Sequence, residues 1–153
     1  MTGPDDGEEQ LSALKRKLFG DSTANVPRVL IELLGHFGVG GFPAAVFERD
    51  YQNAAFGVYW LHGALLHKCE YSGREENAKA THRVFPLDRL TGFTSDFTFE
   101  WDDFHNRHTG WNRQITLTPE LNEPIVLEVR GNTQWAAAQN ELIDALLEAF
   151  GAM

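Results

Sequence analysis

The densest run of residues capable of chemistry is EWDDFHNRHTGW, residues 100–111. Its titratable side chains include three carboxylates and two imidazoles, namely Glu100, Asp102, Asp103, His105 and His108. Carboxylate and imidazole groups ligate divalent metals and serve as general acids and bases. Whether they do either here depends on whether the fold brings them together.

The spacing within this run favours a solvent-exposed loop between two strands. His105 and His108 are three residues apart, in a stretch that has no helical stripe and is rich in the turn formers asparagine, threonine and glycine. Asp102 and Asp103 are adjacent, so on an extended chain they point to opposite faces and cannot flank one scissile bond. The candidate metal ligands are therefore His105, His108 and Asp103, with a hairpin loop as the preferred interpretation.

The only cysteine, Cys69, lies near two histidines, His67 and His82, which suggests a nucleophile and its base. On a strand, however, His67 and Cys69 share a face with Leu65 and Tyr71, and a small apolar-facing cysteine is typical of a core. The glycine run GHFGVGGF follows a predicted helix and lacks the Lys-Ser/Thr of a phosphate-binding loop, so we interpret it as a helix end.

Composition excludes several classes of function. The net charge is −9, from 13 basic and 22 acidic residues, and no segment is strongly basic, so we expect no nucleic-acid binding and no attraction to an anionic membrane. A single cysteine excludes internal disulfides. The acidic start does not resemble a signal peptide, and no apolar run approaches the ~20 residues that span a bilayer. We expect a cytoplasmic protein.

The periodicity changes near residue 56. Before it, apolar residues at helical spacing predict two helices, while residues 43–55 fit either a helical turn or a short strand. After it, alternation predicts antiparallel strands, with Phe97, Phe99 and Trp101 on one dry face and Ile115 and Leu117 on another. Further stripes are Ile125, Leu127 and Val129 on a strand, and Trp135, Leu142, Ile143, Leu146 and Phe150 on a C-terminal helix.

These patterns predict an α+β fold with three parts. Residues 1–7 are expected to be disordered, residues 8–55 to form a helical extension, and residues 56–151 to form a sheet followed by a helix. The sheet is expected to be small, curved and antiparallel, or a partly open barrel, capped by the C-terminal helix and flanked by the two N-terminal helices.

The segments YWLHGALLHKCEYSG, THRVFPLDRLTGF and QITLTPELNEPIVLEV, followed by the helix that begins near Trp135, are similar in order to the pleckstrin-homology-like superfold. The resemblance is to its bacterial members and covers about Gly57 to Phe150. It implies a curved sheet plugged at one end by the last helix, and a scaffold used more often for protein contacts than for a reaction.

The resemblance also implies a headgroup-binding cluster, at Lys68, Arg74, Lys79 and Arg83. Acidic residues are interleaved with these four, namely Glu70, Glu75 and Glu76. Interleaved acids oppose the convergence of positive charge that a phosphate requires. A solvated hairpin is therefore the preferred interpretation of this region.

We thus expect a non-enzymatic binding module whose partner is another protein or a second copy. It would act through a sheet edge, its N-terminal helices or the aromatic residues Tyr59, Trp60 and Trp111. No cofactor is expected. Two alternatives stay open: a small-molecule or metal-dependent enzyme using His62, His82, His105 and Asp103, and a headgroup adaptor using the four basic residues above.

Overall fold

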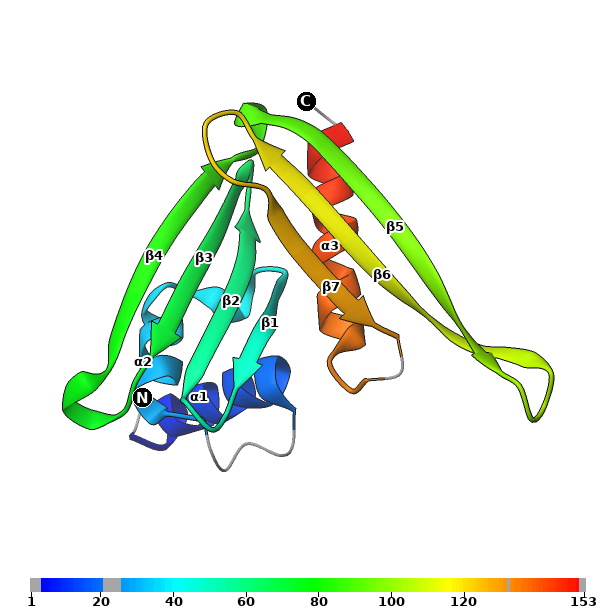
Figure 1. Cartoon of the computed structure of the whole chain (residues 1–153). Helices are drawn as coiled ribbons and strands as arrows, with labels where there is room; N and C mark the ends of the chain where they lie inside the picture. The colour runs from blue at the N-terminus through cyan, green and yellow to red at the C-terminus, as the bar shows by residue number, and fades with distance from the viewer. Residues whose placement is uncertain (1–3, 21–25, 132, 152–153) are drawn as a thin grey trace.

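The computed structural model describes residues 4–20, 26–131 and 133–151. They form an α+β fold of three α-helices and two antiparallel sheets that do not close into a barrel within the described residues (Figure 1), which confirms the predicted fold class. The elements are α1 (Pro4–Phe19), α2 (Arg28–His36), β1 (Ala44–Asp50), β2 (Ala55–His62), β3 (Leu65–Ser72), β4 (Lys79–Pro86), β5 (Leu90–Asp102), β6 (Arg107–Pro119), β7 (Ile125–Arg130) and α3 (Ala136–Gly151), with short 3-10 helices η1 (Val39–Gly41), η2 (Glu75–Asn77) and η3 (Leu87–Arg89).

The strands pair in the order β1-β2-β3-β4 in one sheet and β5-β6-β7 in the other. The ambiguous residues 43–55 contain strand β1, so the first sheet begins before the expected boundary at residue 56. Helix α1 begins at Pro4, within the stretch expected to be disordered, and residues 1–3 lie outside the described residues. The two sheets meet where β4 leads through η3 into β5 and splay apart from that corner (Figure 1).

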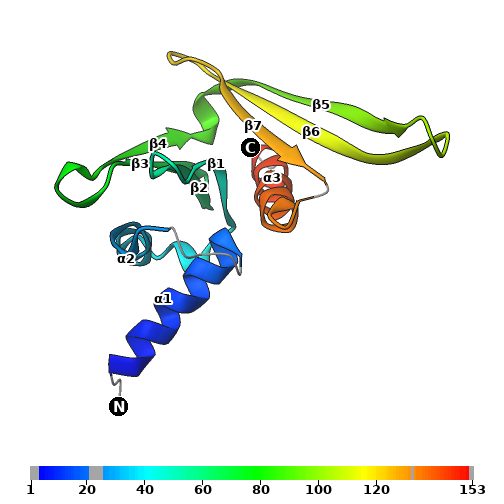
Figure 2. The ribbon, with the colours of Figure 1, turned by 60° about the horizontal axis from the view of Figure 1, so that its bottom comes forward.

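Helices α1 and α2 cover one face of the four-stranded sheet (Figure 2). Their apolar stripes pack on alternate residues of β1, β2 and β3, as the helical and strand periods require. The buried members of this first core include Leu18, Phe19, Leu30, Leu34, Val46, Val58, Trp60 and Cys69. The helices therefore shield this face of the sheet from solvent.

The other face of the same sheet contributes to a second core. Tyr59, Leu61 and Leu66 pack there with residues from the three-stranded sheet and α3. Most predicted inward positions on β6, β7 and α3 are confirmed as buried, namely Ile115, Leu117, Ile125, Leu127, Val129, Leu142, Ile143 and Leu146. The other two residues of the predicted helical stripe are half-buried: Trp135, which precedes α3, and Phe150. The second core fills the narrow end of the angle between the sheets.

Helix α3 packs along β1, the edge strand of the four-stranded sheet. The buried amide of Gln139 donates from Nε2 to the carbonyl oxygen of Val46 at 2.9 Å, next to a register shift between Val46 and Glu48. An edge strand leaves backbone groups without a strand partner, and covering the edge satisfies them. This bond joins α3 to the sheet.

Replacing Gln139 by leucine should destabilise the protein by about 1–3 kcal/mol, because the buried Val46 carbonyl loses its donor while the side-chain volume is kept. Urea unfolding followed by circular dichroism measures the change. The matched control is Gln10→Leu, which alters an exposed glutamine on α1 and should leave the free energy of unfolding within about 0.5 kcal/mol of wild type. Equal effects of the two changes would contradict the role of this bond.

Candidate functional site

The distal part of the β5–β6 hairpin, residues 97–111, projects beyond α3 and the end of β7; we call it the aromatic arm (Figure 1). β5 and β6 have 13 residues each, whereas β7 has 6 and pairs with β6 only between Asn112 and Leu117. The exposed fractions of Phe97, Phe99, Trp101, Phe104 and Trp111 are 49%, 64%, 49%, 90% and 40%. The prediction of a dry face here is therefore wrong, because no described element covers that face.

The aromatic side chains of the arm contact one another across the two strands. Phe97 meets Trp111 with ring centroids 5.7 Å apart, and His108 lies 4.8 Å from Trp101 and 5.8 Å from Phe99. Phe97 and Phe99 are opposite Arg113 and Trp111 in the register, so these four side chains lie on one face. That face continues the one that buries Ile115 and Leu117 under α3.

Asp102 organises the turn at the tip of the arm. One oxygen accepts the backbone N–H groups of Phe104 (3.0 Å) and His105 (3.3 Å), and the other lies 2.5 Å from His105 Nδ1. These bonds lower the pKa of Asp102, with the His105 side chain as the largest cause. Asn106 adopts a positive φ of 51°, which asparagine tolerates in a turn. The predicted hairpin loop is confirmed for residues 103–106.

The candidate metal ligands are not brought together. His105 bonds to Asp102 and touches the Phe104 ring, whereas His108 belongs to β6 and packs on the aromatic face. Phe104, in the turn between them, is 90% exposed. Among the described residues, no three His, Cys, Asp or Glu side chains lie in position to share a metal ion.

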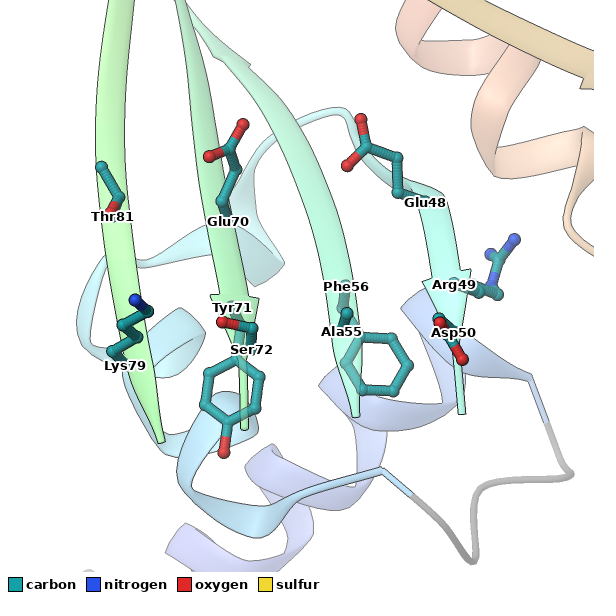
Figure 3. Close-up of a pocket in the computed structure, with 10 residues that line it drawn as sticks. All are labelled: Glu48, Arg49, Asp50, Ala55, Phe56, Glu70, Tyr71, Ser72, Lys79 and Thr81. Atoms are coloured by element: carbon teal, nitrogen blue, oxygen red, sulfur yellow. The ribbon is translucent and has the colours of Figure 1, made fainter. Parts of the chain in front are cut away.

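A groove of about 670 Å³ lies on the four-stranded sheet, toward the wide end of the angle between the sheets (Figure 3). Its lining includes the carboxylates of Glu48, Asp50 and Glu70. Lys68 Nζ lies 3.4 Å from Glu48 and 2.7 Å from Glu70, and it is held over the Tyr59 ring. The bond to Lys68 lowers the pKa of Glu70. We call this the acidic groove, because three carboxylates line it against Arg49 and Lys79, and the neighbouring Lys68 is already paired.

The other three residues of the predicted headgroup cluster are dispersed. Arg74 donates through Nη2 to the carbonyl oxygens of Tyr51 and Gln52, both at 2.9 Å, which fastens the β3–β4 connection to the β1–β2 turn. Lys79 lines the acidic groove from β4, and Arg83 is exposed on β4 opposite Lys68. The four basic groups therefore do not converge on one point that a phosphate could occupy.

Three other predicted residues lie in the interior. Tyr59 and Trp60 are 2% and 1% exposed and belong to opposite cores, which leaves Trp111 as the exposed member of the proposed aromatic cluster. Cys69 is fully buried, and burial raises the pKa of its thiol to about 11. A buried, protonated thiol is a poor nucleophile, which fits the core interpretation.

A histidine pair that sequence reasoning did not identify lies beside the first core. His67 Nδ1 and His82 Nε2 are 2.9 Å apart, their rings are within 6° of parallel, and both stack on Trp60. Phe37 of α2 covers His82, and His62 is the other titratable neighbour of His67. His67 and His82 lie diagonally on the neighbouring strands β3 and β4, so such a pair can be predicted only when the register of the two strands is known.

The hydrogen-bond pattern disfavours protonation of this pair. Nε2 of His67 is buried with no described partner, so we assign the His67 proton to Nδ1, which then donates to neutral His82. A second proton would place two N–H groups against each other or leave a buried N–H of His67 without an acceptor. Burial, with His82 and His62, accordingly lowers the pKa of His67.

Because the folded-state pKa of His67 lies below its unfolded value, its contribution to stability is present above about pH 6.5 and is lost as the pH falls. We expect the free energy of unfolding to decrease from about pH 7.5 to pH 5, and His67→Gln to remove part of that decrease. Urea titrations at the two pH values measure it. His108→Gln, on the exposed arm, is the control that should retain the wild-type decrease, and identical behaviour of both variants would refute the assignment.

No helix in the described part of the chain is both long and apolar enough to cross a membrane. In comparisons with protein-family models, curated proteins and solved structures, none matches this chain. Its function therefore has to be inferred from the arm, the grooves and the buried polar groups described above.

Proposed function

We propose that this chain is a non-enzymatic binding module that makes protein–protein contacts through the aromatic arm, and that its partner is a second copy of the chain. The observation that carries the proposal is the exposed face of the arm, which presents Phe97, Phe99, Trp101 and Trp111. Aromatic residues are enriched at the centres of protein interfaces.

The area of the arm fits an interface. Aromatic side chains of about 150–250 Å² each, at the exposed fractions above, give about 400 Å² for the four aromatic residues of this face. The largest apolar patch of a typical monomer covers about 300–600 Å² and is often functional. A standard interface buries about 800 Å² per partner, so the aromatic face supplies about half of that area.

A second copy meets the requirements of this surface. If two arms pack about a two-fold axis, each aromatic face covers the other, because the same patch of both copies forms the interface. Each copy carries a net charge of −9, so the two repel at long range while the arm contact is apolar. Association through the arm should therefore strengthen with salt, which distinguishes it from binding to a basic partner.

The alternatives have less support from the geometry. Lys68 and Arg74 are already engaged, by two glutamates and by two backbone carbonyl groups, which argues against a headgroup adaptor. The residues named for an enzyme are divided between the arm and the histidine pair: His105 and Asp103 lie at the tip, and His82 lies over Trp60.

We also propose that the two sheets and α3 belong to the pleckstrin-homology-like superfold. Support comes from the order of a four-stranded sheet, a three-stranded sheet and a C-terminal helix packed on them. Members of one superfold perform many functions, so the fold assignment adds no reaction. The arm, and not the sheet core, is the part of the molecule from which the binding proposal comes.

Sedimentation equilibrium at rising concentration tests self-association. The wild type should dimerise, and the double change Phe99→Ser, Trp111→Ser should raise the dissociation constant at least about tenfold, because central aromatic residues each contribute about 2 kcal/mol or more. Raising the salt concentration should tighten the wild-type dimer.

The matched control is Leu121→Ser. Leu121 is 92% exposed in the β6–β7 connection and lies outside the arm, so its removal should leave dimerisation unchanged. A wild type that remains monomeric at about 100 µM or above, or a dimer indifferent to the arm substitutions, would exclude a second copy as the partner.

A further inference from the structure

A second, independent feature is the environment of Arg49 on β1. Arg49 is half-buried and Arg113 is buried, whereas the other described arginines are exposed. Arg113 is paired with Asp144 at 3.3 Å. Arg49 takes part in none of the ion pairs among the described residues. Its Nη2 donates to the Leu18 carbonyl at a long 3.5 Å, the Tyr51 side chain lies beside it, and its Nε is buried without a described partner.

The ring of Trp135 partly stabilises the positive charge of Arg49. The Arg49 guanidinium lies 4.0 Å from the centre of that ring. A cation over an aromatic face is attracted by the electron density of the ring, which replaces only part of the hydration that a half-buried charge loses. Burial lowers the pKa of Arg49 to about 10, so the group remains a cation at neutral pH. Among the described residues, no carboxylate forms an ion pair with this positive charge.

Arg49 points into a second groove of about 440 Å³, formed by the ends of β1 and β7 and the start of α3. Arg49 lines both grooves, and Figure 3 shows its guanidinium pointing away from the carboxylates of Glu48 and Asp50. Phe47, Tyr51 and Trp135 provide aromatic walls. The volume lies within the 300–1,000 Å³ typical of small-molecule pockets.

The polar lining of this second groove has an excess of positive charge. Besides Arg49 it contains Arg130 and the hydroxyl group of Thr133, against the single carboxylate of Glu128. Glu128 is tied to Arg130, at 3.5 Å from its Nε. One unit of positive charge is left over, in a protein whose net charge is −9. A single excess positive charge matches a monoanion better than a multiply charged phosphate.

We propose that this groove binds a small organic carboxylate whose carboxyl group pairs with Arg49 and whose apolar body lies against Phe47 and Trp135. The planar guanidinium offers donors in the geometry that a carboxylate accepts, and desolvation strengthens the pair. An aromatic or aliphatic monocarboxylate can pair with Arg49 and also pack its apolar part against the aromatic residues of the groove. A neutral molecule of the same shape leaves the charge uncompensated, and free phosphate leaves the apolar wall unused.

Phenylacetate is the test probe, with 2-phenylethanol as its neutral counterpart of similar shape. Titrations are followed by ¹H–¹⁵N NMR at the indole N–H of Trp135, which donates to the Phe19 carbonyl at 3.3 Å beside the groove. Phenylacetate should bind saturably with a dissociation constant of about 1 mM. 2-Phenylethanol and inorganic phosphate should each bind at least about tenfold more weakly.

Arg49→Met should weaken phenylacetate binding at least about tenfold while the protein stays folded, since it removes a charge that has no partner. Arg83→Met, which changes an exposed arginine on β4, is the matched control and should bind as wild type. If Arg49→Met does not fold, Arg130→Gln on the exposed rim should still weaken binding several-fold. Absence of a saturable shift, equal binding of phosphate or 2-phenylethanol, or normal binding by the Arg49 variant would each overturn the proposal.

Discussion

The burial of β2 on both faces is the constraint on which the rest of the structure depends. Residues 56–61 of this strand are all buried, with Val58 and Trp60 directed to one core and Tyr59 and Leu61 to the other. Antiparallel sheets commonly leave one face in water, and this one does not. The four-stranded sheet must therefore be covered by α1 and α2 on one side and by α3 with the second sheet on the other.

Local alternation was enough to predict much of this arrangement. The inward positions of β6 and β7 and the stripe of α3 follow from periods of 2 and 3.6, and the structure buries them as expected. The same alternation places Phe97 and Phe99 on the face of Ile115, yet only Ile115 is covered. Periodicity identifies a shared face, whereas coverage depends on the lengths of β7 and α3, which lie elsewhere in the chain.

Sequence spacing was similarly limited in predicting the roles of the candidate site residues. Sequence spacing correctly described residues 103–106 as a loop, but the roles of Lys68 and Arg74 depend on cross-strand and loop contacts that spacing does not contain. Arg49 and Arg83 both occur in strand segments with neighbouring polar residues, and nothing local distinguishes them. What separates them is the contact of Arg49 with the ring of Trp135, which is a property of the tertiary structure.

The splay of the two sheets accounts for both proposed recognition surfaces. The second core fills the narrow end of the angle, and toward the wide end the β5–β6 hairpin continues past α3 while the ends of β1 and β7 form the groove. Helix α3 touches both: Gln139 lines the groove, and Asp144 pairs with Arg113 at the base of the arm. Because Gln139 also bonds to Val46, the groove and the base of the arm share one helix that is joined to the sheet at β1. Any effect of a ligand in the groove on association through the arm would then be matched by an equal effect of association on ligand binding.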